Sequence, residues 1–285
     1  MKTTAGLLLS ATLCSFAAAA QAPPAAGDRL SMDTVRHLHD YQVVEFRRYV
    51  TSPGRRGDFV RYFDAYFPEA FEQLGAMVFG QFAERGDPNR FTWLRGFHDI
   101  QARPVVNAAF YYGPLWREHR AKVNAILPDS DNVMLMRPLH PERGIAVLPA
   151  VDPVLEPDGA QGVVVAQVFP VRKGDEDAFA ARAEQAFAGY AGDGVRSAGV
   201  LVSLDVPNNF PQLPIREDGP WLAWLGVCRD DAALQALSQR LDAAERELAA
   251  GGALRGPAER IVMDPTPRSR LRWLDAGGVV GEATP

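Results

Sequence analysis

VVEFRRYVTSPGRRGDFVRYF, residues Val43 to Phe63, changes its hydrophobic period partway along. Apolar and polar residues alternate up to Val50, a period of two that is typical of a strand with two different faces. Pro53-Gly54 interrupts this pattern. From Phe59 to Phe71 the apolar residues recur at a spacing of three or four, which is typical of one stripe of a helix. The stretch therefore predicts a strand that leads into a helix through a short turn.

The same two periods predict the rest of the first half of the chain. We expect strands at 41–50, 76–84, 90–98 and 132–137, and helical regions at 58–74 and 100–127. Pro68 should kink or restart the first helix, and Gly113-Pro114 should break the second. The order β-α-β-β-α-β is that of the ferredoxin-like fold, a four-stranded antiparallel sheet with both helices on one face.

The pattern restarts after a proline-rich linker at 139–160. Strands are expected at 162–171, 195–206 and 221–227, helices at 175–190 and 231–250, and a closing strand at 259–263 or 271–274. We interpret the chain as an internal duplication with two α+β domains, 41–138 and 161–275. An N-terminal extension at 21–40 and a C-terminal tail at 276–285 flank them.

In each half, the sheet face opposite the helices is largely apolar and needs a cover. If the two sheets cover each other face to face, one chain forms a closed β-barrel. If each half pairs with its counterpart in a second chain, the barrel forms by homo-oligomerisation. The duplication favours the barrel within one chain.

The N-terminus is typical of a secretory signal peptide, because an early lysine precedes a short apolar run that ends in small residues. Cleavage is expected after Ala20, which predicts a periplasmic or secreted protein without a membrane span. The net charge of −5 disfavours nucleic acid as a partner. Only Cys228 remains after cleavage, so no intrachain disulfide is expected, and its apolar strand predicts a small buried side chain.

The first half resembles the NIPSNAP family of the dimeric α+β barrel superfamily from about Tyr41 to Pro138. The matching positions lie on the first three strands, the turns and both helical regions: Glu45, Arg47, Tyr49, Pro53-Gly54, Phe59, Phe63, Gly75, Gly80, Phe82, Asn89, Trp93, Phe97, Arg103 and Trp116. The loop and strand at 207–224 are similar to those of bacterial tandem members. The second half lacks the Glu-x-Arg-x-Tyr strand and has Gln167, Phe169 and Val171 instead. The resemblance implies fold and assembly more than chemistry, since the superfamily includes cofactor-free monooxygenases, haem degraders, isomerases and plain binding proteins.

Glu45, Arg47 and Tyr49 are the candidate catalytic residues, because they project from one face of the first strand. We expect Val44 and Phe46, on the other face, to meet the helices, which would turn the polar set toward the barrel interior. There the carboxylate could handle protons and the tyrosine hydroxyl could orient a ligand carbonyl. The alternative is a buried structural ion pair.

A ligand pocket is predicted from the third strand and the second helical region, with Trp93, Arg95, His98, Arg103, Tyr112 and Trp116 as its candidate residues. Trp93 and Arg95 share a strand face, and the break at Gly113-Pro114 would let Tyr112 and Trp116 fold over the sheet edge as a lid. The alternatives are core packing and, for the aromatic residues after 108, an oligomer contact.

Histidine is the only plausible source of metal ligands, and no metal site is predicted, because only His37 and His39 are close in sequence. His119 is the residue to consider for haem, although its charged neighbours favour a solvated position. No nucleophile elbow, phosphate loop or dinucleotide fingerprint is present, so no cofactor is predicted.

Three functions remain open. The first is binding of a small apolar or aromatic ligand, or of a protein partner, at the paired sheets. The second is a cofactor-free monooxygenase-like or isomerase-like enzyme acting on an aromatic substrate. The third is haem binding.

Overall fold

The structure is a computed structural model that describes residues 40–274. The expected signal peptide, His37, His39 and the tail at 276–285 lie outside these residues. The first half contains β1 (Val43–Val50), α1 (Arg56–Tyr66), α2 (Pro68–Gln73), β2 (Met77–Glu84), β3 (Arg90–Phe97), α3 (Ala102–Tyr111), α4 (Pro114–Ile126) and β4 (Asp129–Pro138). The second half contains β5 (Val163–Pro170), α5 (Glu176–Phe187), β6 (Val195–Ser203), β7 (Trp221–Cys228), α6 (Asp231–Ala250) and β8 (Glu259–Pro265). The expected element order is confirmed in both halves.

Local sequence explains where the helices begin and end. Pro68 begins α2 and Pro114 begins α4, at the first helical turn, where a missing N–H costs nothing. Asp230 caps α6, because its side chain accepts a hydrogen bond from the backbone N–H of Ala233. Gly75, with φ of +95°, makes the turn from α2 into β2 in a conformation that other residues rarely adopt. The proline breaks therefore restart the helices where the sequence predicts it.

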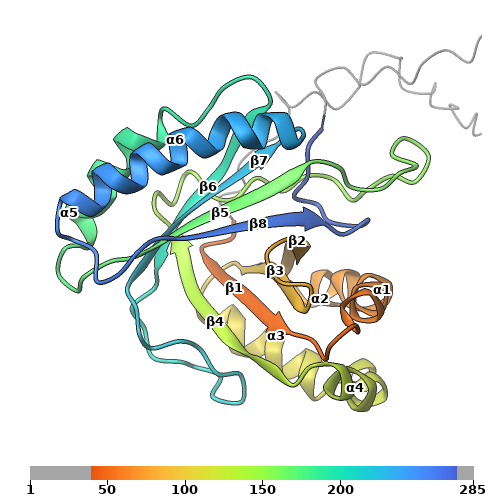
Figure 1. The fold of residues 1–285 in the computed structure, drawn as a ribbon. Coiled ribbons are helices and arrows are strands. Elements are labelled where there is room, and N and C mark those ends of the chain that lie inside the picture. Colours follow the sequence, from red (N-terminus) through yellow and green to blue (C-terminus); the bar gives the residue numbers. More distant parts are fainter. Residues whose placement is uncertain (1–39, 275–285) are drawn as a thin grey trace, which may run out of the picture.

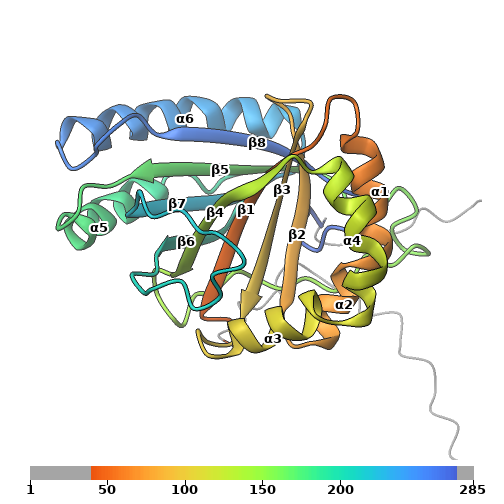
Figure 2. The same ribbon diagram turned by 90° about the horizontal axis from the view of Figure 1, so that it is seen from below.

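The eight strands form one closed barrel in the order β1-β3-β2-β8-β5-β7-β6-β4. Each half contributes four antiparallel strands, and the seams between halves are the antiparallel pairs β2–β8 and β4–β6. α1–α4 cover the outer face of the first sheet, and α5 and α6 cover that of the second (Figure 1, and seen from below in Figure 2). The predicted barrel within one chain is confirmed. Of the two candidate closing strands, 259–263 is used and lies within β8, while the candidate at 271–274 forms no named strand and contributes an isolated bridge between Trp273 and Gln161.

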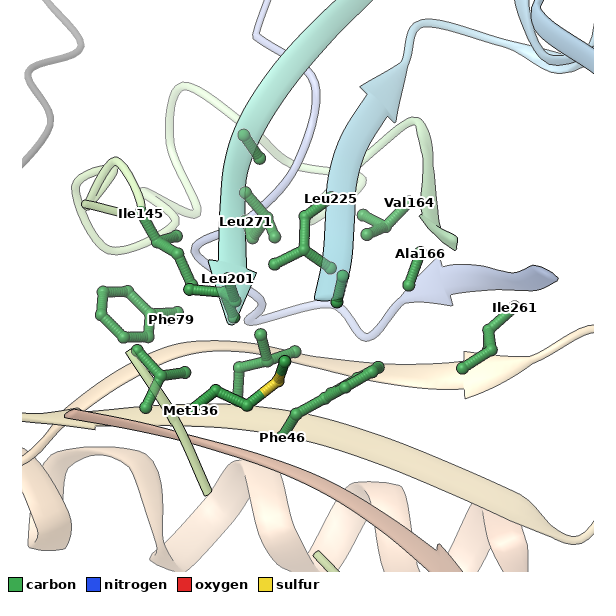
Figure 3. Packing of buried hydrophobic residues seen from close by; sticks show 14 of the residues in the cluster. Phe46, Phe79, Met136, Ile145, Val164, Ala166, Leu201, Leu225, Ile261 and Leu271 are labelled. Carbon is green, nitrogen blue, oxygen red and sulfur yellow. The ribbon is translucent and has the colours of Figure 1, made fainter. Parts of the chain in front are cut away.

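The barrel interior is filled by apolar side chains from both sheets (Figure 3). Phe46 and Met136 come from the first sheet and meet Val164, Leu225 and other residues of the second. Burial of this mutual face removes from water the apolar surface that each half would otherwise expose. This interior is a packed core.

The expected orientation of β1 is wrong. Val44 and Phe46 belong to the barrel core, whereas Glu45 and Arg47 point to the other side of the sheet, toward the helices. Both faces of β1 are buried, so the rule that polar residues face solvent does not distinguish them. Val44 and Phe46 pack in the apolar barrel core, and Glu45 meets Arg103 on α3. Arg48 also faces the barrel, near the end of β1, where it pairs with Glu84 and Glu259.

The segment at 139–160 is not a free linker. Ile145 is buried in the barrel core and Leu148 is also buried, at 2% exposure each. Arg270 and Arg272 fix this segment through their hydrogen bonds to Leu148 O and Pro149 O. The segment therefore covers one end of the barrel.

No helix within residues 40–274 is long and apolar enough to cross a membrane. Cys228 is fully buried, and burial raises the pKa of its thiol to about 11. The prediction of a small buried side chain is confirmed.

Candidate functional site

A buried cluster of three arginines and one glutamate lies between the first sheet and α3. Glu45 Oε2 accepts hydrogen bonds from Arg47 Nη1 at 2.8 Å and from Arg95 Nε at 2.6 Å, and Glu45 Oε1 accepts one from Arg103 Nε at 2.7 Å. The side chains are at most 1% exposed. Sheet register explains the assembly, because Glu45 pairs directly with Arg95 on the neighbouring strand.

The Glu45 carboxyl is held ionised. Burial alone would raise its pKa, but the guanidinium groups of Arg95, Arg47 and Arg103 outweigh burial and hold the pKa well below its usual range. A carboxylate with this pKa and with both oxygens already bonded is a poor proton acceptor at neutral pH. The geometry therefore gives Glu45 the role of a residue that positions arginines.

The cluster is not electrically balanced. One carboxylate faces three guanidinium groups, which leaves two surplus positive charges in a buried site. Several donors there have no hydrogen-bond partner among the described residues: Arg95 Nη1 and Nη2, Arg103 Nη2, Trp93 Nε1 and Asn107 Nδ2. Asn107 is four residues after Arg103 on α3, so both lie on the same face of that helix. Buried donors and unbalanced charges are costly and normally find partners.

An aromatic cavity of about 400 Å³ lies beside this cluster, between the first sheet and the helices. Arg47, Tyr49 and Trp93 form its wall on the sheet side. The helices contribute mainly aromatic side chains: Phe59, Phe63, Phe67, Phe71, Phe110, Tyr111, Tyr112 and Trp116. The volume, and aromatic walls interrupted by polar groups such as Arg47, Arg120 and Gln212, are typical of small-molecule sites.

The polar groups at the sheet-side wall are linked. Arg47 Nε donates a hydrogen bond of 2.8 Å to the Tyr49 hydroxyl, while its Nη1 binds Glu45. Burial raises the pKa of the nearby Tyr111 phenol, which the charges of Arg95 and Arg47 counteract. Tyr111 therefore presents a neutral hydroxyl within electrostatic range of both arginines.

The second half of the chain completes this site through the β6–β7 loop (residues 204–220). Phe210, Gln212 and Leu213 line the cavity. Arg103 Nη1 donates hydrogen bonds of 2.9 Å to the side-chain oxygens of Asn208 and Asn209. The loop thus both closes the cavity and holds one arginine of the cluster.

The structure brings most of the predicted site residues together. Trp93, Tyr112 and Trp116 line the cavity, and Arg95 and Arg103 belong to the cluster. Trp116 packs against Phe110 and Tyr111, while Tyr112 is 61% exposed at the rim. A lid formed by these aromatics, or an oligomer contact through Tyr112, stays a prediction.

His98 does not join this group. It is exposed just beyond the end of β3, stacks on Tyr41 at 4.7 Å between ring centroids, and bonds to Asp40 O. It does not line the aromatic cavity. Leu94, on the opposite face of β3 from Trp93 and Arg95, points into the barrel core.

The expectation that His119 is solvated is wrong. It is 8% exposed, its Nδ1 contacts the Tyr62 hydroxyl, and its ring packs on Tyr66 at 4.3 Å. The charged neighbours in sequence point elsewhere because only one face of α4 meets the core. His119 does not line the aromatic cavity, so its position does not favour haem ligation there. Within residues 40–274 no group of three or more His, Cys, Asp or Glu side chains is placed to hold a metal ion.

The second half has no equivalent charge cluster at the matching strand positions. Gln167 pairs with Trp224 as Arg47 pairs with Trp93, and Val165 pairs with Gly226 as Glu45 pairs with Arg95. The Trp224 ring covers Gly226, since a Cβ there would lie 2.0 Å from its Cη2 atom. An apolar layer fills this space, and the strand there lacks the Glu-x-Arg-x-Tyr pattern.

The sequence predicted Arg103 on α3 but did not predict the other site residues of α3 or those of the distant loop. Phe110 and Tyr111 were part of an aromatic stretch that was noted only for its later members. Asn208 and Phe210 belong to the loop at 207–224 that was recognised as similar to tandem members, and that resemblance was the available signal. A larger cavity of about 580 Å³, lined by both charge types, lies on the other side of the same loop against α5.

The NIPSNAP family model matches residues 44–140, which confirms the resemblance of the first half. No curated protein matches the sequence. A solved structure of a candidate monooxygenase from Lactobacillus acidophilus is 12% identical, with a TM-score of 0.53 over 82% of this chain and 98% of that chain. An anthrone oxidase-like protein is 15% identical, with a TM-score of 0.51 over 84% and 97%. A NIPSNAP domain protein from Burkholderia xenovorans is 17% identical and covers 33% of this chain and 90% of its own, with a TM-score of 0.30. At these identities the full-length neighbours show a shared fold.

Proposed function

We propose that this protein binds a small aromatic molecule in the cavity between the first sheet and α1–α4. The observation that carries the proposal is the cavity itself, about 400 Å³ in volume and lined by aromatic rings around Arg47. Aromatic walls favour a flat ligand, and the charged groups of Arg47 and Arg120 in the lining can fix its orientation. The site differs from the one expected at the paired sheets, whose shared interior is a packed core.

The rigidity of the surroundings supports a preformed site. Trp93 is held by edge contacts with Tyr49 at 6.0 Å and Phe63 at 5.0 Å, and Phe71 stacks on Phe110 at 3.9 Å. A cavity whose walls are already packed loses little conformational entropy when a ligand enters.

Native mass spectrometry of the protein purified from its own host tests the proposal. We expect an adduct of a few hundred daltons that disappears on denaturation. Leu213→Trp should abolish the adduct because the indole fills the cavity rim, whereas Val105→Trp, on an exposed part of α3, should retain it. An adduct retained equally by both variants would place the ligand elsewhere and refute the proposal.

A second candidate function is cofactor-free oxygenation or isomerisation of the bound aromatic. It is favoured by the hydroxyls of Tyr49 and Tyr111, which border the cavity beside Arg47 and could orient or protonate a substrate oxygen. The full-length structural neighbours include candidate monooxygenases, and that likeness extends to fold only. Oxygen consumption with anthrone as substrate tests this function, and Tyr49→Phe should lower it. If the wild type consumes no oxygen above the rate without protein, this route is excluded for anthrones.

We also propose that the protein reaches the periplasm or the exterior of the cell, because the first residues have the pattern of a signal peptide. N-terminal sequencing of the protein from its host checks this, and a chain that still begins at Met1 would contradict it.

A further inference from the structure

We propose that the ligand of the aromatic cavity is an acid, an aromatic carboxylate whose anionic oxygens bind the arginine cluster. This inference rests on the proposed function and adds the chemical class of the ligand. The positive charge of the arginine cluster and its unpaired hydrogen-bond donors point to an anion, whereas the shape of the cavity alone does not.

The first step is the charge of the cluster. Glu45 neutralises one of three guanidinium groups that are all buried to 1% exposure or less. Two uncompensated cations in such a place are costly unless a counter-charge enters, because burial removes most of their hydration. An anionic ligand would supply the missing charge.

The second step is the geometry of the unused donors. Arg95 Nε donates a hydrogen bond to Glu45, and both Nη atoms of Arg95 lack a partner among the described residues. Arg103 Nη2 and Asn107 Nδ2, one helical turn apart on α3, are likewise unpaired. These donors outnumber the single unpaired acceptor there, Asn107 Oδ1, so the site is suited to a group that only accepts hydrogen bonds. A carboxylate is such a group, and a planar guanidinium can bind it through two parallel hydrogen bonds.

Arg47 is the cluster residue that lines the cavity, and Arg95 packs on Trp93, a residue of the cavity wall. The Arg95 guanidinium lies over the Trp93 ring, 5.2 Å from its centroid, and Trp93 lines the cavity. Arg47 lines the cavity directly, and its Nε and Nη1 donate to Tyr49 and Glu45, whereas its Nη2 donates to none of the described residues. An aromatic acid can therefore place its ring among the cavity's aromatic side chains and its carboxylate toward Arg47 and Arg95.

The test compares 2-naphthoate with 2-naphthamide, two probes of nearly the same shape that differ in charge, by isothermal titration calorimetry on the full chain. We expect naphthoate to bind at least about tenfold more tightly, because hydrogen bonds to a charged group contribute more than neutral ones. Equal affinities would overturn this inference and leave the proposed function standing. Absence of binding by both probes up to millimolar concentration would count against the proposed function itself.

Two variants assign the preference to the cluster. Arg95→Met should remove most of the difference between the two probes while leaving naphthamide binding within about threefold, since it keeps both Glu45 oxygens bonded to Arg47 and Arg103. Arg61→Met makes the same charge change on an exposed part of α1 and should leave the difference unchanged. If Arg95→Met keeps the full preference, the anion is bound elsewhere and the assignment is wrong. Circular dichroism of each variant shows whether a loss of binding reflects a loss of fold.

Discussion

Replacing Glu45 with glutamine should destabilise the protein much more than replacing Arg95 with methionine, although both changes break the same buried ion pair. Glu45 accepts three hydrogen bonds of 2.6 to 2.8 Å from guanidinium groups. Glutamine removes the one negative charge of this cluster and turns an N–H₂ group toward the guanidinium donors. Removing one member of a buried ion pair in this way costs about 3–5 kcal/mol, a large share of a typical stability of about 5–15 kcal/mol.

Arg95→Met has a smaller expected cost. Both oxygens of Glu45 stay bonded, to Arg47 and to Arg103, and the surplus of positive charge falls from two to one. The losses are one hydrogen bond and the contacts of the guanidinium with the Phe71, Trp93 and Phe97 rings, whose centroids lie 4.7, 5.2 and 5.1 Å away. We expect a cost of about 1–2 kcal/mol, partly offset by the relief of charge repulsion.

Urea unfolding followed by circular dichroism and tryptophan fluorescence measures both values. Equal slopes against urea would show that the variants differ in stability and not in the extent of unfolding. Arg61→Met, exposed on α1, serves as the control for loss of a positive charge and should stay within about 0.5 kcal/mol of the wild type. If Arg95→Met costs as much as Glu45→Gln, the cluster has no surplus of positive charge and the reasoning fails.

The stability difference between the wild type and Glu45→Gln should depend on pH. The guanidinium groups outweigh burial and hold the pKa of Glu45 below its usual range in the folded protein. The carboxylate therefore contributes stability above the unfolded-state pKa of about 4.3, and this contribution is lost as the pH falls further toward the folded-state value. The advantage of the wild type over Glu45→Gln should shrink by about 1.4 kcal/mol for each pH unit below 4. A constant difference between pH 7 and pH 3 would show that charge is not the cause.

Other predictions concern separate parts of the molecule. Asp64→Asn keeps the Oδ1 acceptor, and because burial raises the pKa of the Asp64 carboxyl, the variant should gain in melting temperature over the wild type as the pH rises above about 4. Gly96→Ala should cost about 1–3 kcal/mol in urea unfolding, because its Cβ would lie 2.5 Å from the buried Phe79 ring. Asn209→Ala, which removes a partner of Arg103, should weaken 2-naphthoate binding severalfold in calorimetry and leave the fold intact. The mass of the protein purified from its host should correspond to cleavage after Ala20, and an intact N-terminus would contradict export.

Elements with a strong local signal were predictable from sequence. The helix at 231–250 has the predicted bounds because Asp230 caps its start and the apolar stripe runs without interruption to its end. The prolines at 68 and 114 predicted the split of the first-half helices, and the uncovered apolar sheet faces predicted the closed barrel. These features depend on neighbours in sequence or on a face that must be buried.

The side of the sheet that carries the site was not predictable from alternation. On β1 both faces are buried, so Glu45 and Phe46 look alike in exposure, and only their partners distinguish them. Arg103 and Asn208 meet across more than one hundred positions of sequence, at a separation of 105. Such a contact follows from the closure of the barrel and the path of a loop, and no local period encodes it.

The β6–β7 loop has a consequence for how the chain tolerates change over evolutionary time. The second half contributes two things to the site. Its sheet covers the barrel-facing side of the first sheet, and its β6–β7 loop supplies Asn208, Asn209 and Phe210. The layer between the second sheet and its helices α5 and α6 has no such role in the site, so its residues can change to apolar ones without loss of the site. Under the proposed function, the first half needs the loop of the second half to complete its cavity, so neither half alone would form the whole site.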